Sequence, residues 1–404
     1  MKIGTEVGIV KYLVLFYYLF ATTLFYALAI YATGNGVSYH LFGEGDDGVF
    51  YWEQAMNVFY DLSWIRTSIY PWIIGNFMQL IGTDSVFAIR IFNFMGMVLL
   101  IHFALKLVSF QVASSNLVEQ EYDIRQRAYL LTLFSFVAYI SLFINITTSI
   151  YRDVWIYMLF VAATYLATRW LFEKNWTYFL FLLPTVWLLG QFRTYALLSF
   201  VAATALWLIV HLFRKVIPPI FFLGFALILL GLTYTFLIDV QIPIVDKTLR
   251  DALQYRSDGI GILAGGSQMG IPLDVSNYFI FLFNYVHSYV GNLIGPLPWH
   301  IRSVTTVVVF FLEAMPMIFM LAFLCFKRSW ITSVQGFILT QAFVWNGLIA
   351  ITNDNVGTAL RLRAIAFLFI LFVFVVLYSR HRSEITKKIE SNVILPSVNL
   401  SKKS

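Results

Sequence analysis

The sequence predicts an all-α, polytopic membrane protein: a bundle of about ten transmembrane helices, with further helices lying against the membrane at its outer face. Composition is the first reason. Hydrophobic residues make up 60% of the 404 residues and charged residues only 12%, about half the charged share of a soluble domain. A chain this apolar has too few polar residues to cover a water-exposed surface, so the lipid bilayer is its expected partner.

Apolar runs of about 20 residues, the length that crosses a bilayer, are the second reason. We predict spans at 12–31, 86–110, 128–147, 154–171, 178–190, 195–212, 217–238, 303–326, 331–351 and 364–378. The segment 278–299 is also apolar. An eleventh span there would place the basic C-terminus outside, so we predict a re-entrant or interfacial helix for it.

The distribution of charge predicts the orientation. With the N-terminus in the cytoplasm, the inner side carries 17 Lys and Arg and 7 acids, whereas the outer side carries 10 and 13. Basic residues favour cytoplasmic loops, so we expect both termini to face the cytoplasm across the cell (inner or plasma) membrane. Residues 1–380 form the membrane domain, with outer loops at 32–85 and 239–302. Residues 381–404 form a cytoplasmic tail, and the polar stretch from 379 onward is predicted to be largely disordered.

The two outer loops contain distinctive segments. Apolar residues in 48–62 recur at helical spacing, which predicts an amphipathic helix on the membrane surface, and a second short helix is expected after Pro71. The glycine-rich stretch 258–270 lacks the spacing of a nucleotide P-loop, and we expect a flexible loop that covers a substrate. The single cysteine and six scattered histidines do not suggest a zinc site. The basic residues form no stripe with interleaved aromatics, so no nucleic-acid partner is expected.

Unusual charges gather at the predicted outer face. They are Asp46, Asp47, Arg90, Arg152, Asp153, Arg193, Asp354, Arg361 and Arg363. Nine of the ten outer basic residues are Arg, whose planar fork binds phosphate oxygens in pairs and tolerates partial burial. Free nucleotides are absent from that compartment, so the pattern favours a phosphate carried on a lipid.

Each of these charges also has a structural interpretation. Asp46 and Asp47 would be solvated loop acids, Arg152 and Asp153 a helix cap or local ion pair, and Arg193, Arg361 and Arg363 interfacial anchors. Glu313, deep in a predicted span, either pairs with an arginine inside the bundle or lines a substrate cavity. His287 belongs either to the aromatic belt at the interface or to that cavity.

The stretch DDGVFYWEQAMN, then Pro71, then GTDSVFAIRIFNFMGMVLL resembles the GT-C superfamily of membrane glycosyltransferases, of the protein mannosyltransferase or aminoarabinose transferase type. That family has an acidic pair at the start of a juxtamembrane helix, a proline-containing segment, and an R-φ-x-N-φ-φ-G opening to the second span. Asp46 and Asp47 match the pair, and Arg90, Asn93 and Gly96 match the opening. Arg152, Asp153 and Arg193 also look like this group, and the resemblance covers roughly residues 12–215.

The resemblance implies transfer of a sugar, with inversion, from a polyprenyl-phosphate-linked donor to a cell-envelope glycan or lipid acceptor at the outer face. Asp46 or Asp47 would act as general base. Arg361 and Arg363 are the leading candidates to hold the leaving phosphate, and the donor site would be completed by Arg90, Arg152, Asp153 and Arg193. Some members hold a divalent cation such as Mg²⁺ or Mn²⁺ on such acids and others do not, so the sequence leaves a cofactor open.

Three other functions remain open. A polysaccharide polymerase of the O-antigen or capsule type, or a ligase, would use polyprenyl-diphosphate-linked glycans at similar arginines. A flippase or transporter of lipid-linked sugars would have functional charges throughout the membrane depth, whereas only Glu313 is deep. A noncatalytic scaffold would tolerate Asp46→Asn and Asp47→Asn.

Overall fold

The computed structural model describes residues 4–39, 47–114, 121–213, 230–242, 246–262 and 268–400. Helices make up most of this part of the chain, which contains isolated β-bridges and no strand, so the predicted all-α class is confirmed. The helices are α1 (Thr5–Thr33), α2 (Asp47–Phe59), α3 (Tyr70–Ile81), α4 (Val86–Ala113), α5 (Glu121–Ala138), α6 (Ile140–Thr147), α7 (Asp153–Glu173), α8 (Trp176–Phe192), α9 (Thr194–Phe213), α11 (Leu249–Ile262), α12 (Tyr278–Ile294), α13 (Val304–Val309), α14 (Met315–Phe326), α15 (Ser333–Thr352), α16 (Val356–Leu362) and α17 (Ala364–Leu400).

Seven helices in the described residues are long and apolar enough to cross a membrane, and an eighth span is formed if the bent pair α5–α6 is counted as one. The seven are α1, α4, α7, α9, the continuous run 304–326, α15 and α17. Helix α8 is apolar but shorter, at 17 residues. Most of the predicted span 217–238 lies outside the described residues. The chain is therefore a multi-pass membrane protein, and the count of about ten remains a prediction.

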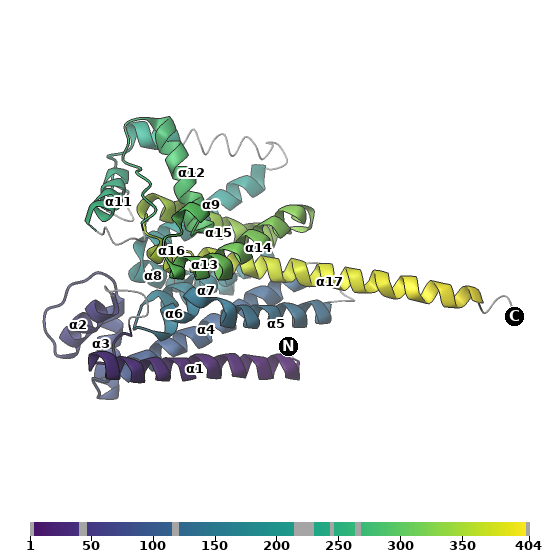
Figure 1. Cartoon of the computed structure of the whole chain (residues 1–404), viewed down its shortest axis with the longest axis horizontal. Helices are drawn as coiled ribbons and strands as arrows, with labels where there is room; N and C mark the ends of the chain where they lie inside the picture. Colours follow the sequence, from purple (N-terminus) through teal and green to yellow (C-terminus); the bar gives the residue numbers. More distant parts are fainter. Residues whose placement is uncertain are drawn as a thin grey trace.

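The long helices lie side by side, and both chain ends lie toward the same end of the bundle (Figure 1). Helices α2 and α3 lie at the opposite end. We call these the terminus end and the site end. The best-buried apolar stretches belong to α7 and α17, at 72% and 78%, because these two helices are surrounded by the others. The position of the termini agrees with an even number of spans.

The predicted span 128–147 is bent by 63° between α5 and α6. Tyr139, at the bend, has an extended backbone conformation. A break like this frees backbone N–H groups at the start of the new helix, and buried N–H groups need an acceptor. The carboxylate of Glu313 supplies one, since its Oε1 accepts from the N–H of Ser141 at 2.7 Å. Glu313 lies in a single π-helical turn, Phe310–Ala314, between α13 and α14.

The predicted amphipathic helix and the helix after Pro71 are both present, as α2 and α3. They pack closely, because a Cβ on Gly75 would lie 2.6 Å from the Cβ of Val58. A glycine at this position lets α3 pack directly against α2. The first residue of α2 is Asp47. The close packing of the two helices therefore helps to position one of the predicted site residues.

Two predictions about irregular segments need correction: the disordered tail, and the part of the glycine-rich loop at 258–262; residues 263–267 of that loop lie outside the described residues. The residues from 379 onward continue α17 as a helix through Leu400, supported at its start by an ion pair between Arg380 and Glu384, one turn apart. The first part of the predicted glycine-rich loop belongs to α11, which extends to Ile262. Most of segment 278–299 forms α12 (Tyr278–Ile294), which is inclined steeply to the long helices (Figure 1). Its entry into the membrane remains a prediction.

Candidate functional site

Five charged residues from four separate segments gather at the site end. Asp47 begins α2, Arg152 and Asp153 begin α7, Arg193 lies between α8 and α9, and Arg361 ends α16. We call these five the arginine–aspartate cluster. Asp47 and Asp153 each occupy the first turn of a helix, where the helix dipole stabilises a negative charge, and Arg361 occupies a last turn, where it stabilises a positive charge.

Arg361 is the centre of the cluster, since its guanidinium bridges two carboxylates. Its Nη2 donates to Asp153 Oδ2 at 2.7 Å and to Asp47 Oδ2 at 2.9 Å, and its Nε donates to Asp153 Oδ2 at 3.1 Å. Asp153 is buried, with 1% of its side chain exposed, whereas 53% of the Asp47 side chain is exposed. Asp153 thus fixes Arg361 from inside the bundle, while Asp47 meets it from the solvent side.

The other two arginines in the cluster are held less tightly. Arg193 Nη1 lies 3.7 Å from Asp153 Oδ1, beyond hydrogen-bond distance. The Nε atoms of Arg152 and Arg193 are buried and have no hydrogen-bond partner. The Oδ1 atom of Asp153 is likewise buried and accepts no hydrogen bond. Buried polar atoms normally have partners, so these unused donors are suited to an anion that enters the site.

Aromatic rings form the walls beside the arginines. The guanidinium carbon lies 4.4 Å from the Tyr151 ring centroid for Arg361, 5.0 Å from that of Tyr195 for Arg193, and 5.3 Å from that of Tyr51 for Arg152. Cation–π contacts of this kind hold the flat face of a guanidinium and leave its edge free to donate. The rings therefore orient the arginine edges without using their N–H groups.

Arg361 keeps its positive charge at physiological pH. Burial opposes the charge on Arg361, but the carboxylates of Asp153 and Asp47 outweigh that effect and raise the pKa of its guanidinium. Burial raises the pKa of Tyr51, on α2, to about 12, so this tyrosine stays neutral. Three guanidinium groups face two carboxylates, which leaves the five residues with one net positive charge. A site of this sign favours an anionic ligand.

Arg90, predicted to bind the donor, has a structural position instead. It is 2% exposed and donates to the backbone carbonyls of Gly36, Val37, Thr147 and Thr148 at 2.7–3.1 Å. These carbonyls belong to the loop after α1 and to the end of α6, and Arg90 satisfies them in place of water. The guanidinium is thus occupied by backbone carbonyls, and a role for Arg90 in binding the donor stays a prediction.

Asn93, one turn after Arg90, continues the same support. Its Nδ2 donates to the carbonyl of Tyr151 at 3.0 Å, and its Oδ1 accepts from the Tyr70 hydroxyl and from Trp155 Nε1. The R-φ-x-N opening of α4 therefore holds the loop that leads into Arg152 and Asp153. It positions the cluster without belonging to it.

Arg363 also lies apart from the cluster. Its Nη2 pairs with Glu313 Oε2 at 2.5 Å, with both side chains at 2% exposure or less, and its Nη1 donates to the carbonyl of Gly295. The expectation that Glu313 pairs with an arginine inside the bundle is confirmed. The expectation that Arg363 holds a phosphate is not supported, because its buried guanidinium already has partners.

The remaining predicted residues are easily placed. Asp46 lies outside the described residues. His287 accepts from Trp299 Nε1 at 3.0 Å and stacks on His300, with ring centroids 5.5 Å apart. These aromatic contacts are typical of an interfacial position.

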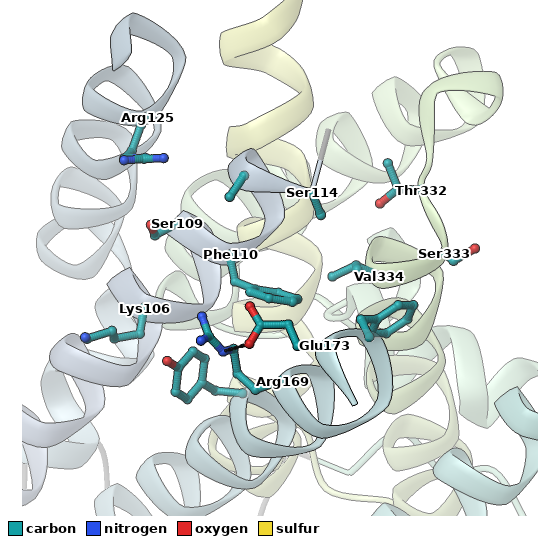
Figure 2. Close-up of a pocket in the computed structure, with 13 residues that line it drawn as sticks. Lys106, Ser109, Phe110, Ser114, Arg125, Arg169, Glu173, Thr332, Ser333 and Val334 are labelled. Carbon is teal, nitrogen blue, oxygen red and sulfur yellow. Dashed lines mark ion pairs between the residues drawn. The ribbon is translucent and has the colours of Figure 1, made fainter. Parts of the chain in front are cut away.

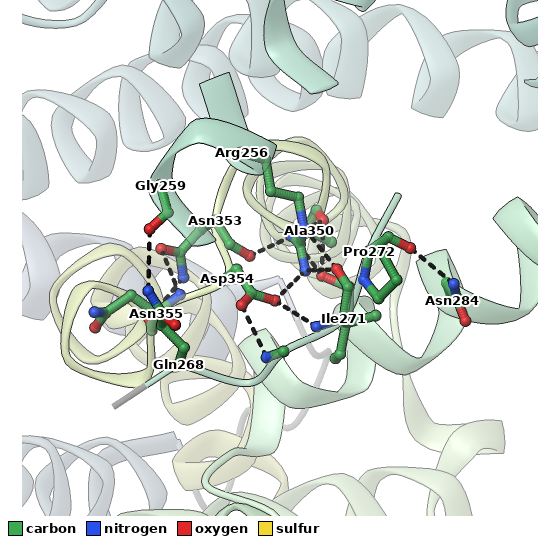
Figure 3. Close-up of polar contacts among 12 residues, drawn as sticks. Arg256, Gly259, Gln268, Ile271, Pro272, Asn284, Ala350, Asn353, Asp354 and Asn355 are labelled. Atoms are coloured by element: carbon green, nitrogen blue, oxygen red, sulfur yellow. Dashed lines mark hydrogen bonds and ion pairs between the residues drawn. The ribbon is translucent and has the colours of Figure 1, made fainter. Parts of the chain in front are cut away.

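A further buried arginine, Arg256, was not singled out from the sequence. It lies on α11 and pairs with Asp354 at 2.6 Å, and it donates to the carbonyls of Ile271, Ala350 and Asn353 (Figure 3). Asp354 in turn accepts from the N–H groups of Gly270 and Ile271. The arrangement fastens α11 to the end of α15. The only signal in the sequence was an arginine among outer-loop residues, which does not reveal burial.

The cofactor stays open, as it does in the sequence. Arg361 bridges Asp47 and Asp153, and Asp46, the other acid of the predicted pair, lies outside the described residues. Across the described part of the chain, no three His, Cys, Asp or Glu side chains lie close enough together to hold a metal ion. A divalent cation on the acidic pair therefore stays a prediction.

Comparisons of this chain with protein-family models, with curated proteins and with solved structures found no match. The functional interpretation therefore rests on the residues and their geometry.

Proposed function

We propose that this chain is an integral membrane glycosyltransferase. It moves a sugar from a polyprenyl-phosphate-linked donor to a cell-envelope glycan or lipid acceptor at the outer face of the membrane. The observation that supports this most is the convergence of Asp47, Asp153 and Arg361 from segments as far as 314 residues apart, beside two arginines with unused buried donors. The site end also lies at the edge of the membrane domain, where a lipid-borne phosphate would be found.

The donor phosphate would bind Arg152 and Arg193 and compete with Asp47 for Arg361 Nη2. A phosphate that takes this donor releases the Asp47 carboxylate, which is half exposed and accepts the proton of the acceptor hydroxyl. The acceptor oxygen then bonds to the anomeric carbon. The carbon–oxygen bond to phosphate breaks, and its electron pair stays on the phosphate, where the arginines stabilise the added charge. Asp153 stays paired and positions Arg361 throughout.

The test is a transfer assay with purified protein and defined polyprenyl-monophosphate sugars. Asp47→Asn should lower kcat about 10²–10⁴-fold as expected for loss of a general base, and Arg361→Ala about 10²–10³-fold as for loss of an electrostatic donor. Asp46→Asn belongs in the same series. Arg302→Ala removes an exposed arginine of the outer loop outside the cluster and should leave the rate unchanged. Full activity of both Asp47→Asn and Arg361→Ala would refute the assignment.

A polymerase or ligase is the second candidate, because three converging guanidiniums also suit a diphosphate. The same assay separates the two: transfer from an oligosaccharide on polyprenyl diphosphate, with none from the monophosphate sugar, would favour the polymerase or ligase.

A further inference from the structure

A polar pocket opens at the terminus end of the bundle, on the side away from the arginine–aspartate cluster. Its volume is about 620 Å³, within the usual range for a ligand pocket. It lies where α4 and α7 end and where α5 and α15 begin. Lys106, Arg125 and Arg169 lie on one side, and Thr332, Ser333 and Val334 on the other (Figure 2). None of these residues has a part in the proposed transfer.

Positive charge exceeds negative charge in this pocket. Arg169 pairs with Glu173 at 2.7 Å, and Arg125 pairs with Glu121. Lys106 is exposed, and no carboxylate of the described residues forms an ion pair with it. Among these described residues, three cations against two carboxylates leave one net positive charge. The amino end of the 20-residue helix α15 adds the positive end of a helix dipole from the opposite wall.

Apolar and aromatic groups accompany these charges. Phe110 and Val334 line the pocket, and Phe110 also lies under the Arg169 guanidinium, 5.3 Å from ring centroid to Cζ. Trp330 lies two residues before Thr332 and contacts Lys327 at 4.3 Å. Tryptophan beside lysine marks the headgroup level of a membrane. A ligand here would meet cations at one end and hydrocarbon at the other.

We infer that this pocket binds the phosphate headgroup of an anionic phospholipid in the leaflet at the terminus end. Basic pockets between transmembrane helices, at headgroup depth, suit this class of ligand. Lys106 provides a charge that no carboxylate of the described residues pairs with, and Arg169 and Arg125 provide donors at the pocket wall. The hydroxyl groups of Thr332 and Ser333 border the same space.

The experiment counts lipids bound to the full-length protein by native mass spectrometry, after titration with phosphatidylglycerol or phosphatidylcholine. We expect saturable binding of phosphatidylglycerol to exceed that of phosphatidylcholine. One cation near a membrane surface contributes about 1 kcal/mol, so Lys106→Gln should weaken phosphatidylglycerol binding about fivefold. Lys106 is exposed and its replacement keeps the helix, so the variant should fold. Arg125→Gln serves as a second variant.

Lys388→Gln is the matched control, since it removes the same charge from α17 away from the pocket and should leave binding unchanged. Equal effects of Lys106→Gln and Lys388→Gln, or equal binding of the two lipids to the wild type, would overturn the proposal. Inorganic phosphate is the second arm. Saturable phosphate binding that depends on Lys106 would also overturn the assignment to a lipid, in favour of a soluble ligand.

Discussion

At the scale of single residues, the partners of each arginine decide its role. Arg361 touches a buried and an exposed carboxylate, so it is both fixed and accessible. Arg90 and Arg363 carry the same charge and were also predicted to lie at the outer face. Backbone carbonyls occupy the Arg90 guanidinium, however, and Glu313 occupies that of Arg363. The sequence indicates that an arginine lies at the outer face, but it does not reveal which neighbouring carbonyls need a donor. Of the five predicted arginines, three therefore gather in the cluster, and the two whose guanidinium groups have other partners do not.

The Glu313–Arg363 pair should be structural. Glu313→Gln leaves a buried guanidinium without its counter-charge, and removal of one partner of a buried pair costs about 3–5 kcal/mol. We therefore expect a large fall in thermal stability in detergent. The double variant Glu313→Gln/Arg363→Met removes both charges and should recover much of that loss. Single and double variants of equal stability would show that the pair is not coupled.

His300, outside the spans, should make stability depend on pH. Burial, and then the charge of nearby His287, lower its pKa to about 4. In the unfolded state His300 takes up a proton at the ordinary histidine pKa of about 6.5. In the folded state it stays neutral until the pH is lower. Stability is therefore complete above about pH 6.5 and decreases as the pH falls from there toward about 4. Melting temperatures across this range should fall less in His300→Asn than in the wild type; parallel curves would contradict this assignment.

At the scale of helices, regular elements follow from the sequence and irregular ones do not. Amphipathic spacing predicted α2, and Pro71 predicted α3, since both signals are local. The bend at Tyr139 and the π turn around Glu313 depend on each other through one hydrogen bond across 172 residues. No local pattern contains that contact. The polar residues after 379 continue α17, because low hydropathy alone does not end a helix.

Helix α11 should be held in place by Arg256. Arg256→Met leaves the Asp354 carboxylate buried without its cation, and we expect a loss of about 3–5 kcal/mol and faster hydrogen exchange in 249–262. Arg250, on the same helix, pairs with Asp239, and the two side chains are 58% and 67% exposed. Arg250→Met is the matched control and should leave stability almost unchanged, because an exposed ion pair contributes little. Equal exchange in both variants would exclude Arg256 as the anchor.

At the scale of the whole molecule, the fold separates two polar regions along the helix bundle (Figure 1). The arginine–aspartate cluster lies at the site end, and the basic pocket lies at the terminus end. Composition and hydropathy were enough to predict the membrane class and most of the helices, because the bilayer imposes length and polarity on every span. The assembly of one site from four segments requires the tertiary packing of α7 and α16, which no single segment encodes.

The most direct test of the central claim is binding of the lipid phosphate itself. The protein is titrated with polyprenyl monophosphate and, separately, with the uncharged polyprenol, for the wild type and for Arg193→Gln. Lys106→Gln is included so that binding at the terminus end is distinguished. We expect the wild type and Lys106→Gln to bind the phosphate about 10–100-fold more tightly than the alcohol, as for one or two charge-assisted hydrogen bonds, and Arg193→Gln to lose most of that preference. Equal affinities for the two lipids, or a preference that survives Arg193→Gln, would contradict the assignment of this cluster to a lipid-borne phosphate.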